Sequence, residues 1–187
     1  YNWSGPNSFV SGVQNPTIAG ASTLASGIYS VNVTVAGCTG TNSTISVTVN
    51  PIPLTPTITS NSPLCAGQTL SLTAGTIVGA TYNWTGPNSF TSNIQNPTIV
   101  GTTTLAAGIY SVSATVAGCP GPAGTVSVTI NPIPITPTLT SNSPLCAGST
   151  INLTASAILG ATYNWTGPNS FTSTTQNPTI PGASTLA

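Results

Sequence analysis

Residues 108–116 read Gly-Ile-Tyr-Ser-Val-Ser-Ala-Thr-Val, with Tyr110, Val112, Ala114 and Val116 at every second position. Successive side chains of a β-strand point to opposite faces, so this alternation predicts a strand with one buried face. The positions between them are Ile, Ser and Thr, of which the Ser and Thr suit a solvent-facing side. The stretch therefore predicts a sheet that packs on one side.

The same period-two pattern recurs before and after this strand, and no segment shows a helical period. Gly and Pro lie between the alternating segments, as turns require. We expect strands near residues 57–64, 69–74, 80–85, 109–117 and 125–131, with one or two irregular strands between 90 and 105. Short strands separated by turn residues predict an all-β sandwich.

The sequence repeats with a period of 81 residues. The segment Tyr82–Phe90 is matched by Tyr1–Phe9 and by Tyr163–Phe171. This period is too long for one turn of a solenoid and close to the length of a small sandwich, so each repeat is expected to be a domain of its own.

Pro-rich stretches beginning at Pro51 and Pro132 predict the domain boundaries, because such stretches stay extended. We expect residues 1–50 to be the C-terminal part of a sandwich, residues 51–131 a complete repeat with a Pro-rich linker at its start, and residues 132–187 the N-terminal part of a sandwich. Two interpretations stay open: the chain is a window of a longer array, or its partial repeats complete one another between molecules by strand exchange.

Aromatic residues indicate the kind of sandwich. A Trp on the third strand and a Tyr entering the sixth are the outline of an immunoglobulin-like sandwich, in which that Tyr forms a corner with backbone just upstream. The Trp residues share a strand face with buried-looking Tyr82, which favours core packing over sugar stacking. The expected core markers are Trp3, Trp84, Trp165, Tyr29 and Tyr110.

The motifs Ser-Pro-Leu-Cys-Ala-Gly, Tyr-Asn-Trp-Thr-Gly-Pro-Asn, Ala-Gly-Ile-Tyr-Ser-Val and Val-Thr-Ile-Asn-Pro follow one another within residues 62–132. Together they resemble the PKD-like and immunoglobulin-like tandem repeats of large secreted surface proteins, especially those of Bacteroidetes, and the resemblance covers the whole chain. It implies tandem sandwiches that serve as stalks, adhesins or cell-surface fibres and are not enzymes. Members of that family usually keep some charged residues, whereas this chain has none.

The chain contains no Asp, Glu, Lys, Arg or His. General acid–base catalysis therefore has no candidate residue, and we expect no enzyme, no catalytic residue and no cofactor site. Carboxylate and imidazole metal ligands are missing, so no metal site is expected. Nucleic acid is excluded as a partner because cationic side chains supply most of its binding energy. No apolar run approaches the ~20 residues of a membrane span.

The four cysteines, which are candidates for disulfides, are Cys38, Cys65, Cys119 and Cys146. A secreted setting favours their oxidation. A bridge between Cys65 and Cys119 inside one repeat would have to join opposite ends of the expected sandwich. A bridge from the first cysteine of one repeat to the second cysteine of the next repeat avoids this difficulty. Both pairings and free thiols remain open.

Glycosylation is expected because 58 of the 187 residues are Ser or Thr and an uncharged surface otherwise has little to keep it dispersed. Asn-x-Ser/Thr acceptor patterns occur at Asn2, Asn83, Asn164, Asn32, Asn42 and Asn152. The expected partners are copies of the chain, end to end, together with covalent glycans. We expect a structural extracellular fibre or adhesin stalk, located outside the cell or on its surface. The alternative is a carbohydrate- or surface-binding module.

Overall fold

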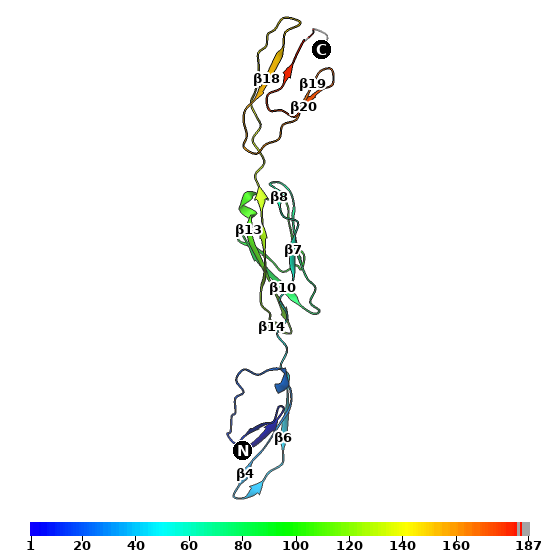
Figure 1. The fold of residues 1–187 in the computed structure, drawn as a ribbon. Coiled ribbons are helices and arrows are strands. Elements are labelled where there is room, and N and C mark those ends of the chain that lie inside the picture. The colour runs from blue at the N-terminus through cyan, green and yellow to red at the C-terminus, as the bar shows by residue number, and fades with distance from the viewer. Residues whose placement is uncertain (183, 185–187) are drawn as a thin grey trace. The chain divides into compact units, whose positions relative to one another are not determined.

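The computed structural model describes residues 1–182 and 184, which fall into two compact units, Tyr1–Asn131 and Pro132–Ala187. In the described residues the regular elements are β-strands and two short 3₁₀ turns, η1 (Thr23–Ala25) and η2 (Thr104–Ala106). The expected all-β class is confirmed. Figure 1 shows the strands of each part.

Residues 57–131 form a complete sandwich, and its larger sheet is antiparallel. The sheet order is β11 (Phe90–Ser92), β10 (Thr81–Gly86) and β13 (Gly108–Val116), and β13 also pairs with β14 (Cys119–Pro120) and β15 (Gly124–Val128). The register places Trp84 opposite Val112 and Tyr110 opposite Val126. These four side chains therefore lie on one face of the sheet.

The facing sheet has the order β12 (Thr98–Ile99), β9 (Leu70–Ala74) and β7 (Ile58–Ser60). A further pair, β8 (Leu64–Cys65) and β16 (Ile130–Asn131), is parallel. Strands β7, β9 and β12 correspond to A, B and E of an immunoglobulin-like sandwich, and β11, β10, β13 and β15 to C′, C, F and G. The strand order thus agrees with the immunoglobulin-like fold expected from the sequence.

The core of this sandwich lies between the two sheets. Its largest fully buried side chains are Trp84, Tyr110, Leu70, Leu72 and Val112. The Tyr110 hydroxyl donates a hydrogen bond of 2.9 Å to the carbonyl of Ala106, at the end of η2. This contact is the tyrosine corner of immunoglobulin-like domains.

Residues 1–50 form the equivalent of the larger sheet, with the order β2 (Phe9–Ser11), β1 (Asn2–Gly5), β3 (Gly27–Asn32) and β6 (Ser43–Val47). A short ribbon of β4 (Thr34–Val35) and β5 (Cys38–Thr39) follows β3. Tyr29 forms the same corner, donating 2.9 Å to the Ala25 carbonyl. Within residues 1–50 no second sheet faces this one.

In the unit Pro132–Ala187, the described residues form the smaller sheet and only two strands of the larger one. Strands β17 (Leu139–Ser141), β18 (Ile151–Ala155) and β21 (Thr179–Ile180) form one sheet, which corresponds to β7, β9 and β12. A ribbon of β19 (Trp165–Gly167) and β20 (Phe171–Ser173) corresponds to β10 and β11. No counterpart of β13 or β15 occurs among its described residues.

Two local expectations differ from the structure. The strand expected over residues 57–64 is split into β7 and β8, because Pro63 has no N–H to donate to a ladder. The Pro-rich start of the second repeat lies against its own sandwich: a Cβ on Gly121 would be 2.7 Å from the Pro53 carbonyl oxygen, and one on Gly124 would be 2.6 Å from that of Pro56. These glycines let the segment pass close to the sheet.

Candidate functional site

The candidates for function in the described residues are surfaces. In residues 1–182 and 184 no three Cys side chains, or other metal-binding groups, gather where they could hold an ion. No described helix is long and apolar enough to cross a membrane. The features that remain are an open apolar face, a row of asparagines and the cysteines.

The open face belongs to the sheet of residues 1–50. A cavity of about 460 Å³ lies over it, and aromatic and aliphatic side chains line most of it. Tyr29 and Ile45 are paired across β3 and β6 and so lie on this same face. Ile45 is 61% exposed, although its neighbour Tyr29 is buried.

The complete sandwich shows what normally covers such a face. Val128 of β15 is 2% exposed, whereas Val47 at the equivalent place in β6 is 37% exposed. The difference arises because β9 packs Leu70 and Leu72 into the core of the complete sandwich, and residues 1–50 contain no corresponding strand. The face of β1, β3 and β6 therefore has the composition of a core but lacks its cover.

The three tryptophans also differ in how far the opposite sheet covers them. Trp84 is fully buried, and its Nε1 donates 3.3 Å to the carbonyl of Gln95. Trp165 is half-buried and donates 3.0 Å to the carbonyl of Thr175. Trp3 is also half-buried, and its buried Nε1 finds no acceptor among the described residues. As core markers Trp3 and Trp165 are thus only partly covered, because each stands in a sandwich with one sheet incomplete.

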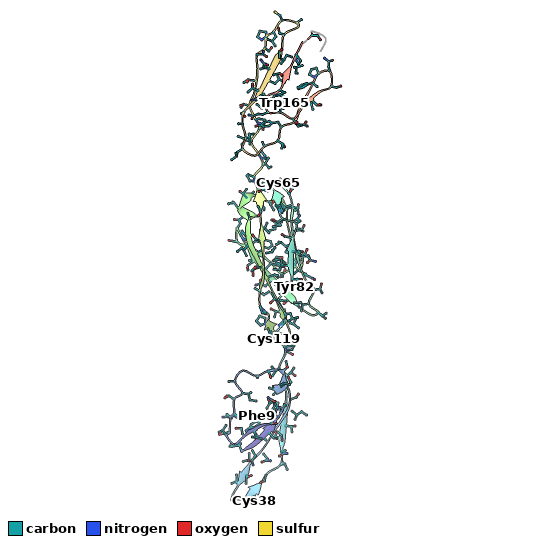
Figure 2. All side chains as sticks on the ribbon, in the orientation of Figure 1. Phe9, Cys38, Cys65, Tyr82, Cys119 and Trp165 are labelled. Carbon is teal, nitrogen blue, oxygen red and sulfur yellow. The ribbon has the colours of Figure 1, made fainter. Side chains whose placement is uncertain are left out.

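The four expected disulfide cysteines are all free thiols. Cys65 ends β8 beside Asn131, whereas Cys119 follows the far end of β13. Figure 2 shows these two cysteines at opposite ends of the complete sandwich. The nine residues of β13 alone span about 26 Å. A bridge inside the repeat is therefore incompatible with this fold, since the Cα atoms of a disulfide lie within about 7 Å.

Three of the six acceptor asparagines form a row on the surface of residues 1–50. The Asn2 Nδ2 donates 3.0 Å to Asn32 Oδ1, and the Asn32 Nδ2 donates 2.9 Å to Asn42 Oδ1. Asn83, Asn152 and Asn164 are exposed on the other parts of the chain. The structure brings the first three together and leaves the others apart.

A contact at the linker was not anticipated from the sequence. The Cys119 Sγ lies 3.9 Å from the carbonyl oxygen of Asn50, and the Asn50 Nδ2 donates 3.3 Å to the carbonyl of Ala117. The repeated Asn-Pro-Ile-Pro segment at residues 50–53 and 131–134 was the available signal. The sequence places the linker from Pro51 onward, and the structure shows that the preceding Asn50 also contacts the following sandwich.

Taken together, the strand order, the buried Trp and the tyrosine corner define an all-β protein of immunoglobulin-like sandwiches. No family model matches the chain, and no curated protein matches it. Similar solved structures include murine CEACAM1b, with 13% identity, a TM-score of 0.39, and coverage of 70% of this chain and 86% of that one.

The ectodomain of mouse nectin-like molecule 4 is 12% identical, with a TM-score of 0.41 and coverage of 98% of this chain and 79% of that one. A titin fragment is 13% identical, with a TM-score of 0.36 and coverage of 97% and 77%. Identities and scores this low carry no statement about function, and the fold assignment rests on the strands themselves.

Proposed function

We propose that the chain is a structural component of an extracellular fibre or adhesin stalk, built from uncharged immunoglobulin-like repeats that associate end to end. It acts outside the cell or on its surface and performs no catalysis. The observation that carries the proposal is that three successive repeats of the chain share one strand pattern and contain no Asp, Glu, Lys, Arg or His. The apolar face of β1, β3 and β6 is the surface through which copies would meet, because burying apolar surface against another element is favourable in water.

The cover that fits this face is the sheet of another repeat. In the complete sandwich β9 supplies Leu70, Leu72 and Ala74 to the core. At the corresponding positions β18 carries Ile151, Leu153 and Ala155. A second copy therefore offers, through residues 132–187, the strands that residues 1–50 lack.

This exchange requires the ribbon of β19 and β20 to be displaced, because β19 has the same place in its repeat as β1 has in the first repeat. Strands β19 and β20 pair with each other and with no other described strand. Displacing the ribbon therefore breaks no ladder of the β17–β18–β21 sheet, which favours exchange between copies.

The absence of charge suits an assembly of this kind. Copies carry no net charge and no ionisable Asp, Glu, Lys, Arg or His side chains, so neither salt nor moderate changes of pH alters their mutual repulsion. The same surface lacks the charges that keep ordinary proteins dispersed. Glycans on exposed Ser, Thr and Asn side chains would supply that dispersion, and an intact mass above that of the polypeptide tests their presence.

Light scattering of the 187-residue chain under reducing conditions tests the association. Ile45→Asp places a charge on the open face, and we expect it to convert oligomers of the wild-type chain into monomers. Ile28→Asp is the matched control, because Ile28 is similarly exposed, at 66%, and alternates with Tyr29 on the other face of the same sheet. A monomeric wild-type chain, or equal effects of the two substitutions, contradicts end-to-end association through this face.

A carbohydrate-binding module is the second candidate, and the row Asn2–Asn32–Asn42 is the observation that favours it. Amides in a row on the surface, two exposed and one half-buried, offer donors and acceptors to sugar hydroxyls. Titration with oligosaccharides would then give binding that Asn32→Ala abolishes. Binding that survives this substitution excludes the row as the site.

A further inference from the structure

The asparagine that precedes each Pro-Ile-Pro segment lies between two successive sandwiches, and its backbone carbonyl group contacts both of them. Asn50 and Asn131 occupy the same place in successive repeats, each preceding Pro-Ile-Pro. The structure shows the contacts of Asn131 with the sandwich before it and those of Asn50 with the sandwich after it. Superimposing the two halves gives the complete surroundings of the asparagine at a junction between two repeats.

On the preceding side the contact is a parallel pairing of strands. Asn131 is the register partner of Cys65, and the Ala66 N–H donates 2.8 Å to the Asn131 carbonyl oxygen. Neighbouring paired residues lie about 5 Å apart. Cys65 is therefore held beside the linker, and its side chain is exposed.

On the following side the contact is made by a thiol. The Cys119 Sγ lies 3.9 Å from the Asn50 carbonyl oxygen. The hydrogen bond of 3.3 Å from the Asn50 side chain to Ala117 fixes the linker against the turn that carries Cys119. Cys119 is half-buried and so remains accessible.

We propose that a disulfide joins the β8 cysteine of each repeat to the β14 cysteine of the repeat that follows it, across the linker asparagine. This inference rests on the proposed function, because it requires repeats in tandem. One carbonyl oxygen accepts the Ala66 N–H from one sandwich and contacts the cysteine thiol of the next. Both cysteines therefore lie beside the same carbonyl group, and the proposal requires their Cα atoms to come within the ~7 Å that a disulfide spans.

The other cysteines fit the same scheme. Cys146 occupies the place of Cys65 in its repeat, and Cys38 occupies the place of Cys119. Both are exposed. In this scheme no cysteine of residues 1–187 is the partner of another cysteine of the same chain, so each would pair with a cysteine of a further repeat joined to the chain or of another copy.

The oxidation is a thiol–disulfide exchange with a small organic disulfide such as oxidised glutathione. One cysteine loses its proton, and its thiolate attacks the glutathione disulfide, releasing one glutathione thiolate and forming a mixed disulfide. The thiolate of the second cysteine then attacks the protein sulfur and releases the second glutathione. Two protein thiols are oxidised to one disulfide, one glutathione disulfide is reduced to two thiols, and the two protons pass to the released thiolates.

The test extends the full chain, after residue 187, with a copy of residues 107–131, which completes the third repeat. The extended chain is oxidised with glutathione disulfide, alkylated, digested with chymotrypsin and mapped by mass spectrometry. We expect the peptide Cys65–Leu70 to be joined to the appended cysteine peptide, with Cys38, Cys119 and Cys146 alkylated. The appended peptide and the Cys119 peptide differ in mass, because the latter continues to Leu139.

A link from Cys65 to Cys119, a link from Cys146 to the appended cysteine, or complete alkylation of Cys65 overturns the proposal. In the extended chain, Cys65→Ser should leave every remaining cysteine alkylated, which controls for scrambling. A second extended chain with Cys38, Cys119 and Cys146 changed to Ser should form the same single bridge. Because association is measured under reducing conditions, failure of the bridge and failure of end-to-end association are seen separately.

Discussion

Tyr110 combines a buried ring with a satisfied hydroxyl. Its ring lies edge-on to Phe90 with centroids 5.5 Å apart, and its hydroxyl donates to the Ala106 carbonyl. The sequence predicted both the burial and the corner, because the alternation gives the inward face and the position at the start of the strand gives the corner. The 3₁₀ turn that supplies the acceptor was not predicted, since three residues are too few to show a helical period.

Tyr110→Phe should destabilise the complete sandwich by about 1–3 kcal/mol, because it leaves the buried Ala106 carbonyl without its donor. Hydrogen exchange of peptides from residues 57–131 measures this loss directly for the complete repeat. Tyr1→Phe is the control, since Tyr1 is 44% exposed and should have no effect. Unchanged protection in Tyr110→Phe would show that the corner does not stabilise the sandwich.

The ring of Tyr110 leaves no room for a side chain at position 86, which is a glycine. A Cβ at this position would lie 2.6 Å from the Tyr110 Cε1. Gly86→Ala should therefore destabilise the repeat by about 1–3 kcal/mol through forced displacement of the ring. Gly167→Ala is the matched variant, because a Cβ at Gly167 would have its nearest contact at 3.4 Å, with Phe171 Cδ1. Equal thermal shifts for the two variants would contradict the steric explanation.

At the scale of elements, alternation located the strands of the complete repeat but not their pairing. The ladder between β7 and β9 ends at Ser60, after which the Asn61 Oδ1 accepts the Ser71 N–H at 2.9 Å. The chain then leaves this sheet and pairs as β8 with β16, in a separate two-stranded parallel sheet. Alternation carries no information about such a crossing, because both sheets share one core and hence one pattern.

Strand β9 covers the larger sheet, and Leu72 at its centre is 1% exposed. Leu72→Ala should cost about 2–5 kcal/mol, because it removes buried methyl groups and leaves a cavity between the sheets. Leu54→Ala is the control, since Leu54 is 82% exposed. Hydrogen exchange in residues 57–131 distinguishes them, and a loss below about 1 kcal/mol for Leu72→Ala would mean that β9 is not the essential cover.

At the scale of the molecule, the expectation of no catalysis comes from composition alone, because the chain has no Asp, Glu, Lys, Arg or His. The sequence predicted that residues 1–50 are the C-terminal part of a sandwich, and hence that the strands covering their sheet lie outside them. It did not predict how far each side chain is exposed. Ile45 and Val47 are 61% and 37% exposed, whereas Val128 is buried.

The free energy of unfolding should be independent of pH between about 5 and 7, because no side chain of this composition titrates there. Burial raises the pKa of Tyr110 above its ordinary value of 10.0. The unfolded chain therefore loses this proton at a lower pH than the folded chain, so the stabilisation is complete below that pH and falls as pH rises above it. Urea titrations from pH 5 to pH 7 test the pH-independent range, and titrations above pH 10.0 measure the loss caused by Tyr110. A free energy of unfolding that decreases from pH 7 to pH 5 would contradict the expected independence of pH.

Electron microscopy of the purified chain tests the central claim most directly, because end-to-end association through the open face has to produce elongated assemblies. The account predicts filaments or rods many repeats long, which persist at high salt and in reducing buffer and disappear in Ile45→Asp. A field of single particles of one chain each, unchanged by concentration, would contradict it.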